Sequence, residues 1–244
     1  MSSLTILHTS DFHGHLDIAK AEKLRIRKKE LGALYFDCGD LIKAGNLALP
    51  TKPDSGWSFL ETIGVDAVTL GNRETHPLEA PFGMKLSGCK QALVANLYRK
   101  GQENAPLSIG SCSILDSLIL EHAGLRVGCF GVMVPMVTKR MKTAFASAYL
   151  WEDPVSTAKV VASKLRNECD VLIALTHVGL SVDKRIASEC PEIDLILGGH
   201  SHDVLEQPLK VGKTFISHTG SHGRSYGEYK WSEGELRGGL HPLR

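Results

Sequence analysis

The sequence has no long apolar run, since none of its hydrophobic stretches approaches the roughly 20 residues that a membrane-spanning helix needs. Its N-terminus leads almost directly into the short apolar residues 4–7, without the charged lead and long apolar stretch of a signal peptide. We therefore expect a cytoplasmic protein without a membrane partner.

An excess of charge of one sign is also missing. The chain has 28 Lys and Arg residues against 27 Asp and Glu residues, which gives a formal net charge of +1. Proteins that bind nucleic acid usually present a basic field, so nucleic acid is disfavoured as a partner. The basic residues 20–29, on an expected helix, are either a solvated surface or a patch for an anionic partner.

The spacing of the cysteines and the low content of aromatic residues argue against further classes of protein. The six cysteines are scattered and form no C-x-x-C pair, which argues against a disulfide framework or a zinc knuckle and predicts reduced, mostly buried thiols. Aromatic residues make up only 6% of the chain and include no obvious pair for stacking a nucleobase. The eleven histidines, in contrast, are more than such a chain usually contains.

Short apolar segments rich in β-branched residues recur along the chain and predict buried strands. These segments are residues 4–8, 33–36, 67–70, 92–95, 118–120, 126–132, 171–175, 195–197 and 214–217. Helical patterns lie between several of them, at residues 18–31, 55–63 and 154–168, the last with Asp153 as N-cap and Pro154 at its first position.

The alternation of strands and helices predicts parallel strand pairing over the first two-thirds of the chain. The closing residues 214–236, with a turn signal at residues 232–234, predict antiparallel strands. We expect one α/β domain over residues 1–244 with one or two mixed sheets.

Five polar blocks lie where a predicted strand ends and a loop begins, the position at which α/β sheets build their sites. They are residues 10–14 (Ser-Asp-Phe-His-Gly), 37–40 (Asp-Cys-Gly-Asp), 71–74 (Gly-Asn-Arg-Glu), 176–179 (Thr-His-Val-Gly) and 198–203 (Gly-Gly-His-Ser-His-Asp). Together they offer carboxylate, amide and imidazole ligands, a set suited to divalent Mn, Zn, Fe or Co. Cys38 lies within one block, and we expect it to face inward.

The order of these blocks resembles the calcineurin-like metallophosphoesterase superfamily. Residues 6–16 and 198–202 are similar to the catalytic domain of its 5′-nucleotidase and 2′,3′-cyclic phosphodiesterase branch, and the resemblance extends from about residue 4 to the glycine-rich residues 220–227. This resemblance implies a four-layer αββα sandwich with two mixed β-sheets.

The resemblance also implies two divalent metal ions as cofactors. The implied ligands are Asp11, His13 and His202 for one ion, Asn72, His177 and His200 for the other, and Asp40 as a bridge between both. Two such ions can stabilise the attacking and leaving oxygens together and provide a bridging hydroxide near neutral pH. The implied function is a metal-dependent phosphoesterase, either a phosphodiesterase or a permissive phosphatase, that acts on a small phosphorylated substrate such as a nucleotide.

One block departs from the family, because Arg73 occupies the position where the family usually has the histidine that protonates the leaving group. Arginine cannot release a proton usefully, and loss of a general acid typically lowers rates by about 10²- to 10⁴-fold. We hypothesise that Arg73 clamps the phosphoryl oxygens instead, which favours diesters and esters with good leaving groups. In an alternative interpretation, His76 or His15 supplies the missing proton.

Asn96 and Arg224 are further candidates for substrate binding beside Arg73. Asn96 matches a position that the family often fills with Asn, although a loop or helix cap is the alternative, and Arg224 could equally be a surface residue. The family's nucleotidases have a separate C-terminal domain that stacks the nucleobase. This sequence ends at Arg244, so we expect that domain to be absent and the pocket to be open and permissive.

Two other functions compete with hydrolysis of small phosphate esters. The same residues could form a non-catalytic module with a decayed site that binds metal and phosphate or nucleotide, but retention of all seven implied ligands favours turnover. A nuclease is disfavoured by the near-neutral charge.

Overall fold

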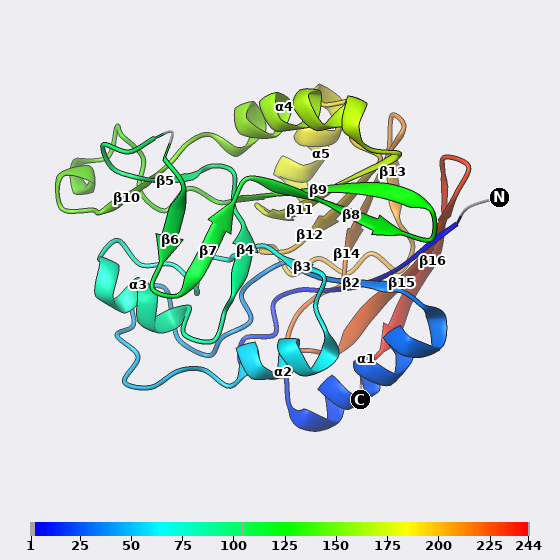
Figure 1. Cartoon of the computed structure of the whole chain (residues 1–244), viewed down its shortest axis with the longest axis horizontal. Coiled ribbons are helices and arrows are strands. Elements are labelled where there is room, and N and C mark those ends of the chain that lie inside the picture. Colours follow the sequence, from blue (N-terminus) through cyan, green and yellow to red (C-terminus); the bar gives the residue numbers. More distant parts are fainter. Residues whose placement is uncertain (1–2, 104, 244) are drawn as a thin grey trace.

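The computed structural model describes residues 3–103 and 105–243. In this part of the chain, two large β-sheets pack face to face and helices cover their outer faces (Figure 1). The first sheet has the order β16 (Glu235–Pro242), β15 (Ser225–Ser232), β1 (Leu4–Thr9), β2 (Leu34–Asp37) and β3 (Ala67–Val68). The second has the order β13 (Leu209–Val211), β14 (Thr214–His218), β12 (Leu195–Gly198), β11 (Val171–His177), β9 (Leu125–Met133) and β8 (Ser117–His122).

Helices α1 (Ile18–Leu31) and α2 (Gly56–Ile63) cover the first sheet, and α4 (Pro154–Leu165) and α5 (Leu180–Glu189) cover the second (Figure 1). Successive residues of β1 show why the layers form. Ile6 packs into the core between the two sheets, whereas Leu7 packs into the core under α1 and α2, and both are fully buried. The predicted αββα sandwich with mixed sheets is confirmed.

The start of α4 follows the sequence signals closely. The Asp153 side chain accepts a hydrogen bond from the Ser156 backbone N–H at 2.8 Å, and Pro154 is the first helical residue. The α-helix ends at Leu165, and residues Arg166–Glu168 form a 3₁₀ turn rather than the predicted last helical turn.

Strand directions agree with the prediction only in part. Within the first two-thirds of the chain, β8 and β9 form an antiparallel hairpin, because the two residues between them are too few for the crossover that parallel pairing needs. β1, β2 and β3 are parallel, as are β9, β11 and β12. β15 and β16 form the predicted antiparallel hairpin around Glu233, but β14 pairs in parallel with β12 in the other sheet. β14 also pairs antiparallel with β13, so the antiparallel prediction is right for that neighbour. It is wrong for β12, because a crossover without a helix connects β12 to β14 and makes the two strands parallel.

Two small sheets, one α-helix and a 3₁₀ helix, η1 (Lys142–Phe145), complete the described chain. The sheets and the α-helix are a mixed sheet of β4 (Gln91–Leu93), β7 (Cys112–Leu115) and β6 (Leu107–Ile109), an antiparallel pair of β5 (Leu97–Arg99) and β10 (Tyr149–Trp151), and helix α3 (Glu79–Lys85). The sequence predicted only β4 among them. Pro81 and Gly83 lie inside α3, and both residue types disfavour helices.

The contacts of α1 and the state of the cysteines bear on two of the sequence-based interpretations. Lys20, Arg25 and Arg27 on α1 form ion pairs with Asp17, Glu22 and Glu228 at 2.8–3.0 Å, which favours a solvated surface helix. All six cysteines are free and buried. Among the described helices, none is both long and apolar enough to cross a bilayer.

Candidate metal centre

The predicted ligands lie at the carboxyl ends of parallel strands from both sheets. Asp11 follows β1, Asp40 follows β2, Asn72 lies beyond β3, His177 is the last residue of β11, and His200 follows β12. Parallel neighbours end at the same sheet edge, and the two sheets face each other, so these side chains meet between the sheets.

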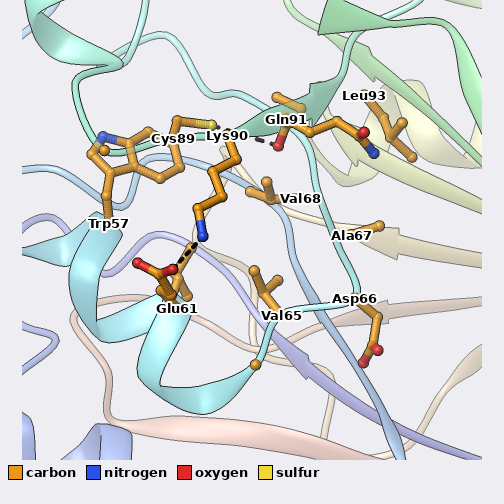
Figure 2. Close-up of a pocket in the computed structure, with 14 residues that line it drawn as sticks. Trp57, Glu61, Val65, Asp66, Ala67, Val68, Cys89, Lys90, Gln91 and Leu93 are labelled. Atoms are coloured by element: carbon orange, nitrogen blue, oxygen red, sulfur yellow. Dashed lines mark hydrogen bonds and ion pairs between the residues drawn. The ribbon is translucent and has the colours of Figure 1, made fainter. Parts of the chain in front are cut away.

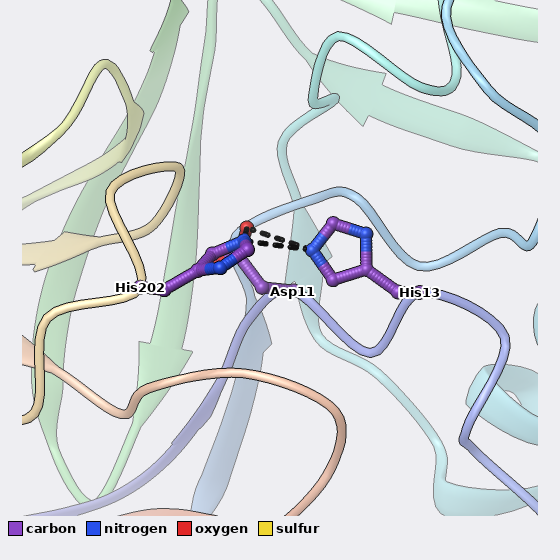
Figure 3. Close-up of side chains that lie close together, drawn as sticks. All are labelled: Asp11, His13 and His202. Atoms are coloured by element: carbon purple, nitrogen blue, oxygen red, sulfur yellow. Dashed lines mark hydrogen bonds and ion pairs between the residues drawn. The ribbon is translucent and has the colours of Figure 1, made fainter.

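The first cluster consists of Asp11, His13 and His202 (Figure 3). The Nε2 atoms of His13 and His202 lie 2.8 Å apart, and each is within 3.5–3.6 Å of Asp11 Oδ1. Two imidazole nitrogens and one carboxylate oxygen therefore converge on one point. This donor set fits a divalent cation of the borderline kind.

The second cluster contains Asp40, His177 and Asn72. His177 Nε2 lies 3.6 Å from Asp40 Oδ1 and 3.2 Å from Asn72 Oδ1. The other ring nitrogen, Nδ1, must donate its proton to the Cys38 carbonyl at 2.7 Å, because that oxygen can only accept. In the neutral ring, Nε2 and Asn72 Oδ1 then present lone pairs to each other, an arrangement that a cation between them would stabilise.

His200 lies beside the second cluster. Its ring centroid is 5.0 Å from that of His177, and its backbone N–H donates to Asp11 Oδ2 at 3.1 Å. Burial lowers the pKa of His200, with the nearby His177 as a further cause. A lowered pKa favours the neutral ring, which is the form that binds metals.

Five of the seven predicted ligands have left-handed backbone conformations. The φ angles are +54° at Asp11, +51° at His13, +53° at Asp40, +82° at His200 and +57° at His202. This conformation costs a non-glycine residue on the order of 1 kcal/mol or more, and such strain concentrates at functional sites. Asp and His tolerate it better than most residues.

The glycine before Asn72 permits the close approach of the two sheets. A Cβ atom at Gly71 would lie 2.2 Å from Asp40 Oδ1 and 2.7 Å from His177 Cε1. Any side chain at this position would displace a predicted ligand, so only glycine fits.

Glu74, from the same block, ties the loops of the site together. Its buried carboxylate accepts hydrogen bonds from the backbone N–H groups of Asp40 and Gly71 at 2.8 Å and of Ile42 at 3.1 Å. These bonds fix the loop after β2 against the loop after β3. Cys38 faces inward as expected, and its thiol donates to the Leu197 carbonyl.

The two central carboxylates have pKa values shifted in opposite directions. Burial by itself raises the pKa of Asp11, but hydrogen bonds from His13 and His202 lower it well below its ordinary value. Burial raises the pKa of Asp40. The Arg73 backbone N–H, which donates to Asp40 Oδ1 at 2.7 Å, offsets part of this increase. The Asp11 hydrogen bond raises the pKa of His202.

The candidate catalytic residues lie at the margin of the cluster. The Arg73 Nε atom is 3.8 Å from Asp40 Oδ2, and its Nη1 donates to the Lys43 carbonyl at 3.2 Å. His76 is buried, and its Nδ1 accepts from the Leu78 backbone N–H at 3.0 Å. Within residues 3–103 and 105–243, no hydrogen bond or ion pair joins His76 to a predicted ligand.

The other two substrate-binding candidates have different surroundings. The Asn96 side chain is buried; its Nδ2 donates to the Met133 and Glu152 carbonyls, and its Oδ1 accepts from the Met133 backbone N–H. This pattern is that of a cap for the end of β9, and the substrate-binding role stays a prediction. Arg224 is exposed. Burial is the main cause that lowers the pKa of His222, three nearby histidines lower it further, and the Arg224 charge makes the smallest contribution.

His222 was not predicted as a site residue, yet it lies beside the first cluster. Its ring centroid is 5.0 Å from those of both His13 and His15 and 6.0 Å from that of His202. Its backbone N–H donates to the Asp11 carbonyl at 2.7 Å, and its φ is +63°. The only sequence signal was its place in the glycine-rich residues 220–227.

A separate cavity of about 310 Å³ lies between α2 and β4 (Figure 2). Trp57, Val65 and Leu93 line it, and an ion pair between Lys90 and Glu61 crosses it. Its described lining includes none of the predicted site residues, so it is distinct from the metal centre.

Comparison with known proteins agrees with this geometry. The family model described as calcineurin-like phosphoesterase matches residues 4–204. The chain belongs to this family. The match covers all the predicted ligands, from Asp11 to His202.

Several curated proteins are similar to this chain over most of its length. The uncharacterised metallophosphoesterase YunD of Bacillus subtilis (strain 168) is 25% identical over 234 residues, which cover 92% of this chain and 49% of YunD. The 5′-nucleotidase of Mus musculus is 28% identical over 230 residues, which cover 83% of this chain and 38% of the relative. The chain thus spans half or less of the length of these relatives.

Solved structures share the fold. The 5′-nucleotidase precursor from Thermus thermophilus superposes with a TM-score of 0.78 at 20% identity, over 98% of this chain and 54% of that one. A putative 5′-nucleotidase from Staphylococcus aureus gives a TM-score of 0.80 at 15% identity, over 99% and 54%. The αββα architecture is therefore the one found in these proteins.

Proposed function

We propose that residues 1–244 form one domain that hydrolyses small phosphate esters with two divalent metal ions. Diesters and esters with good leaving groups are the preferred substrates, and alkyl monoesters are poor ones. The observation behind this proposal is the meeting of oxygen and nitrogen ligands from both sheets, at Asp11, His13, Asp40, Asn72, His177, His200 and His202.

The donor set is compatible with Mn, Zn, Fe or Co. One ion is assigned to Asp11, His13 and His202, the other to Asn72, His177 and His200, and Asp40 to both. Such ions, when bound, supply Lewis acidity and lower the pKa of water towards neutrality.

The residues of the chain position the substrate and the ligands. The Asp40 carboxylate is oriented by the Arg73 backbone N–H at 2.7 Å, and the Arg73 guanidinium lies beside that carboxylate with 31% of its side chain exposed. A partly exposed guanidinium next to the ligands is suited to hold phosphoryl oxygens. It cannot protonate a leaving oxygen, which is the reason for the proposed substrate preference.

In an alternative interpretation, His76 supplies the proton that Arg73 cannot donate. Its Nδ1 accepts a hydrogen bond from Leu78, so the ring proton of the neutral form lies on Nε2.

The 5′-nucleotidase relatives make a nucleotide one candidate substrate. The free, buried cysteines support a reducing, cytoplasmic location as part of this proposal.

The test is steady-state hydrolysis by metal-stripped protein reloaded singly with Mn, Zn, Co, Ni or Mg. Bis-p-nitrophenyl phosphate, p-nitrophenyl phosphate and AMP are compared, with Asp40→Asn as the control. The proposal predicts cleavage of the aryl substrates, little cleavage of AMP and loss of activity in Asp40→Asn. Preferential cleavage of AMP would overturn the role of Arg73, and metal binding without turnover would indicate a binding module.

A further inference from the structure

Lys85, the last residue of α3, has its ammonium group inside the protein and surrounded by backbone carbonyls. The residue is 1% exposed. Its Nζ donates to the carbonyl oxygens of Gly45, Asn46, Arg73 and Thr75 at 2.8, 2.7, 2.8 and 3.0 Å. An ammonium has three N–H groups, so four acceptors use its full donor capacity.

These carbonyls come from the two loops that form one side of the metal centre. Gly45 and Asn46 belong to the loop after β2, and Arg73 and Thr75 belong to the loop after β3. Four carbonyl dipoles that point at one position repel one another. The Lys85 charge offsets this repulsion, so it holds the two loops in this arrangement.

The position of the loop after β2 sets the orientation of the Asn72 side-chain amide. The Asn46 side-chain oxygen accepts a hydrogen bond from Asn72 Nδ2 at 2.8 Å, which directs Asn72 Oδ1 towards His177 Nε2 at 3.2 Å. The Asn46 carbonyl is itself held by Lys85. A shift of Asn46 would therefore release the Asn72 amide to rotate.

The same ammonium also restrains Arg73. Lys85 holds its carbonyl, Asp40 accepts from its backbone N–H, and its guanidinium donates to the Lys43 carbonyl in the loop after β2. Lys85 is anchored in turn by Trp57, whose indole N–H donates to the Lys85 carbonyl at 2.8 Å.

We propose that Lys85 is a positioning residue, an internal cation that fixes Asn72 and Arg73 for binding of the second metal ion and of substrate. The inference rests on the proposed two-metal function, and it goes beyond it by assigning a role to a residue that contacts neither metal nor substrate.

A small cavity makes the proposal testable by chemical rescue. It has a volume of about 270 Å³, and Ile42, Met84 and Lys85 are among its lining residues. Propylammonium has the three carbons and the nitrogen that the change Lys85→Ala removes. Because Lys85 itself lines the cavity, we expect Lys85→Ala to extend the cavity to the position of the lost ammonium group and to admit this ion.

The first experiment measures Mn²⁺ binding by calorimetry and hydrolysis of bis-p-nitrophenyl phosphate for Lys85→Ala. We expect the affinity for one of two Mn²⁺ ions to fall about tenfold or more and kcat to fall more than KM rises. Millimolar propylammonium should restore both, whereas 1-propanol should restore neither. Lys90→Ala, which removes a largely exposed lysine outside the metal centre, should behave like the unmodified protein.

The second experiment uses Lys85→Met, which keeps most of the side-chain volume without the charge. We expect a folded protein, judged by circular dichroism, that still binds one Mn²⁺ ion tightly and has lost tight binding of the other. Unchanged Mn²⁺ binding and kcat in folded Lys85→Met, or rescue of Lys85→Ala by 1-propanol as well, would overturn the proposal. Absence of Mn²⁺ binding by the unmodified protein would instead refute the two-metal function on which it rests.

Discussion

The Nε2 atoms of His13 and His202 lie 2.8 Å apart, although 189 positions separate the two residues in the chain. Both also lie within 3.6 Å of Asp11 Oδ1. The three groups belong to loops after β1 and β12, one from each sheet. A ligand that binds all three therefore joins the two sheets at their carboxyl ends.

Metal removal should accordingly destabilise the protein. An ion present at about 100 times its Kd adds roughly 2.7 kcal/mol to the free energy of unfolding, which for a chain of this size raises Tm by about 5–10 °C. We expect a Tm increase of this order when Mn²⁺ is added to chelator-treated protein, measured by differential scanning calorimetry. His202→Ala should show a smaller increase, and an equal increase in both proteins would refute the assignment of His202.

The substitution Arg73→His should restore the proton donor that the family usually has. We expect turnover of an alkyl phosphomonoester to rise about tenfold or more, within the range of general acid catalysis. Steady-state kinetics with AMP and bis-p-nitrophenyl phosphate measure the change. Arg73→Ala, which removes the cation without adding an acid, should lower turnover of both, and an equal gain in Arg73→Ala would contradict the account.

A methyl group at Gly71 should disable the site. Its Cβ would overlap Asp40 Oδ1 and approach His177, and a ligand displaced by about 1 Å typically costs on the order of 100-fold in rate. The matched control is Gly83→Ala, because a Cβ at Gly83 meets only the Gly110 backbone, at 3.5 Å, and its φ is not left-handed. Comparable activity of the two variants would show that the described ligand positions are wrong.

Stability should depend on pH through Asp37, which accepts hydrogen bonds from Thr9 Oγ1 at 2.7 Å and from the Gly39 N–H at 3.1 Å. Burial raises the pKa of Asp37 to about 8 in the folded protein, from an ordinary value of 3.8. Between pH 4 and 8 the unfolded chain therefore binds fewer protons at this position than the folded protein does. The free energy of unfolding then falls as pH rises, by up to roughly 1 kcal/mol per pH unit.

The variant Asp37→Asn should lack this part of the pH dependence. Urea unfolding of chelator-treated protein at several pH values measures the two slopes. We expect a flatter dependence in Asp37→Asn between pH 4 and 8. Identical slopes would mean that Asp37 is ionised in the folded state throughout this range.

The sequence was sufficient to predict the fold where local and tertiary preferences agree. Residues 18–31 have a helical pattern, and the long strands are apolar on both faces because both faces are buried. The three-residue strands β5 and β6 could not be predicted, since their pairing depends on partners elsewhere in the chain. α3 contains Pro81 and Gly83, so its helical conformation depends on packing rather than on intrinsic propensity.

The places of the candidate ligands in the fold were predictable to a similar degree. Asp11 and His200 were placed correctly at strand ends because carboxylates and imidazoles beside glycines are recognisable in the sequence. Lys85 was missed because its partners are backbone carbonyls, which every residue has and which no sequence pattern marks. His222 was missed because its approach to His13 depends on a left-handed backbone at a position with no expected role.

The most direct test of the account is a count of bound divalent ions in purified protein and in Asp40→Asn, by elemental analysis after equilibration with Mn²⁺ and by calorimetric titration. The account predicts two ions per chain in the unmodified protein. In Asp40→Asn, whose carboxylate is assigned to both ions, it predicts one ion or none together with loss of phosphodiester cleavage. A single ion in the unmodified protein, or two equally tight ions in Asp40→Asn, would contradict it.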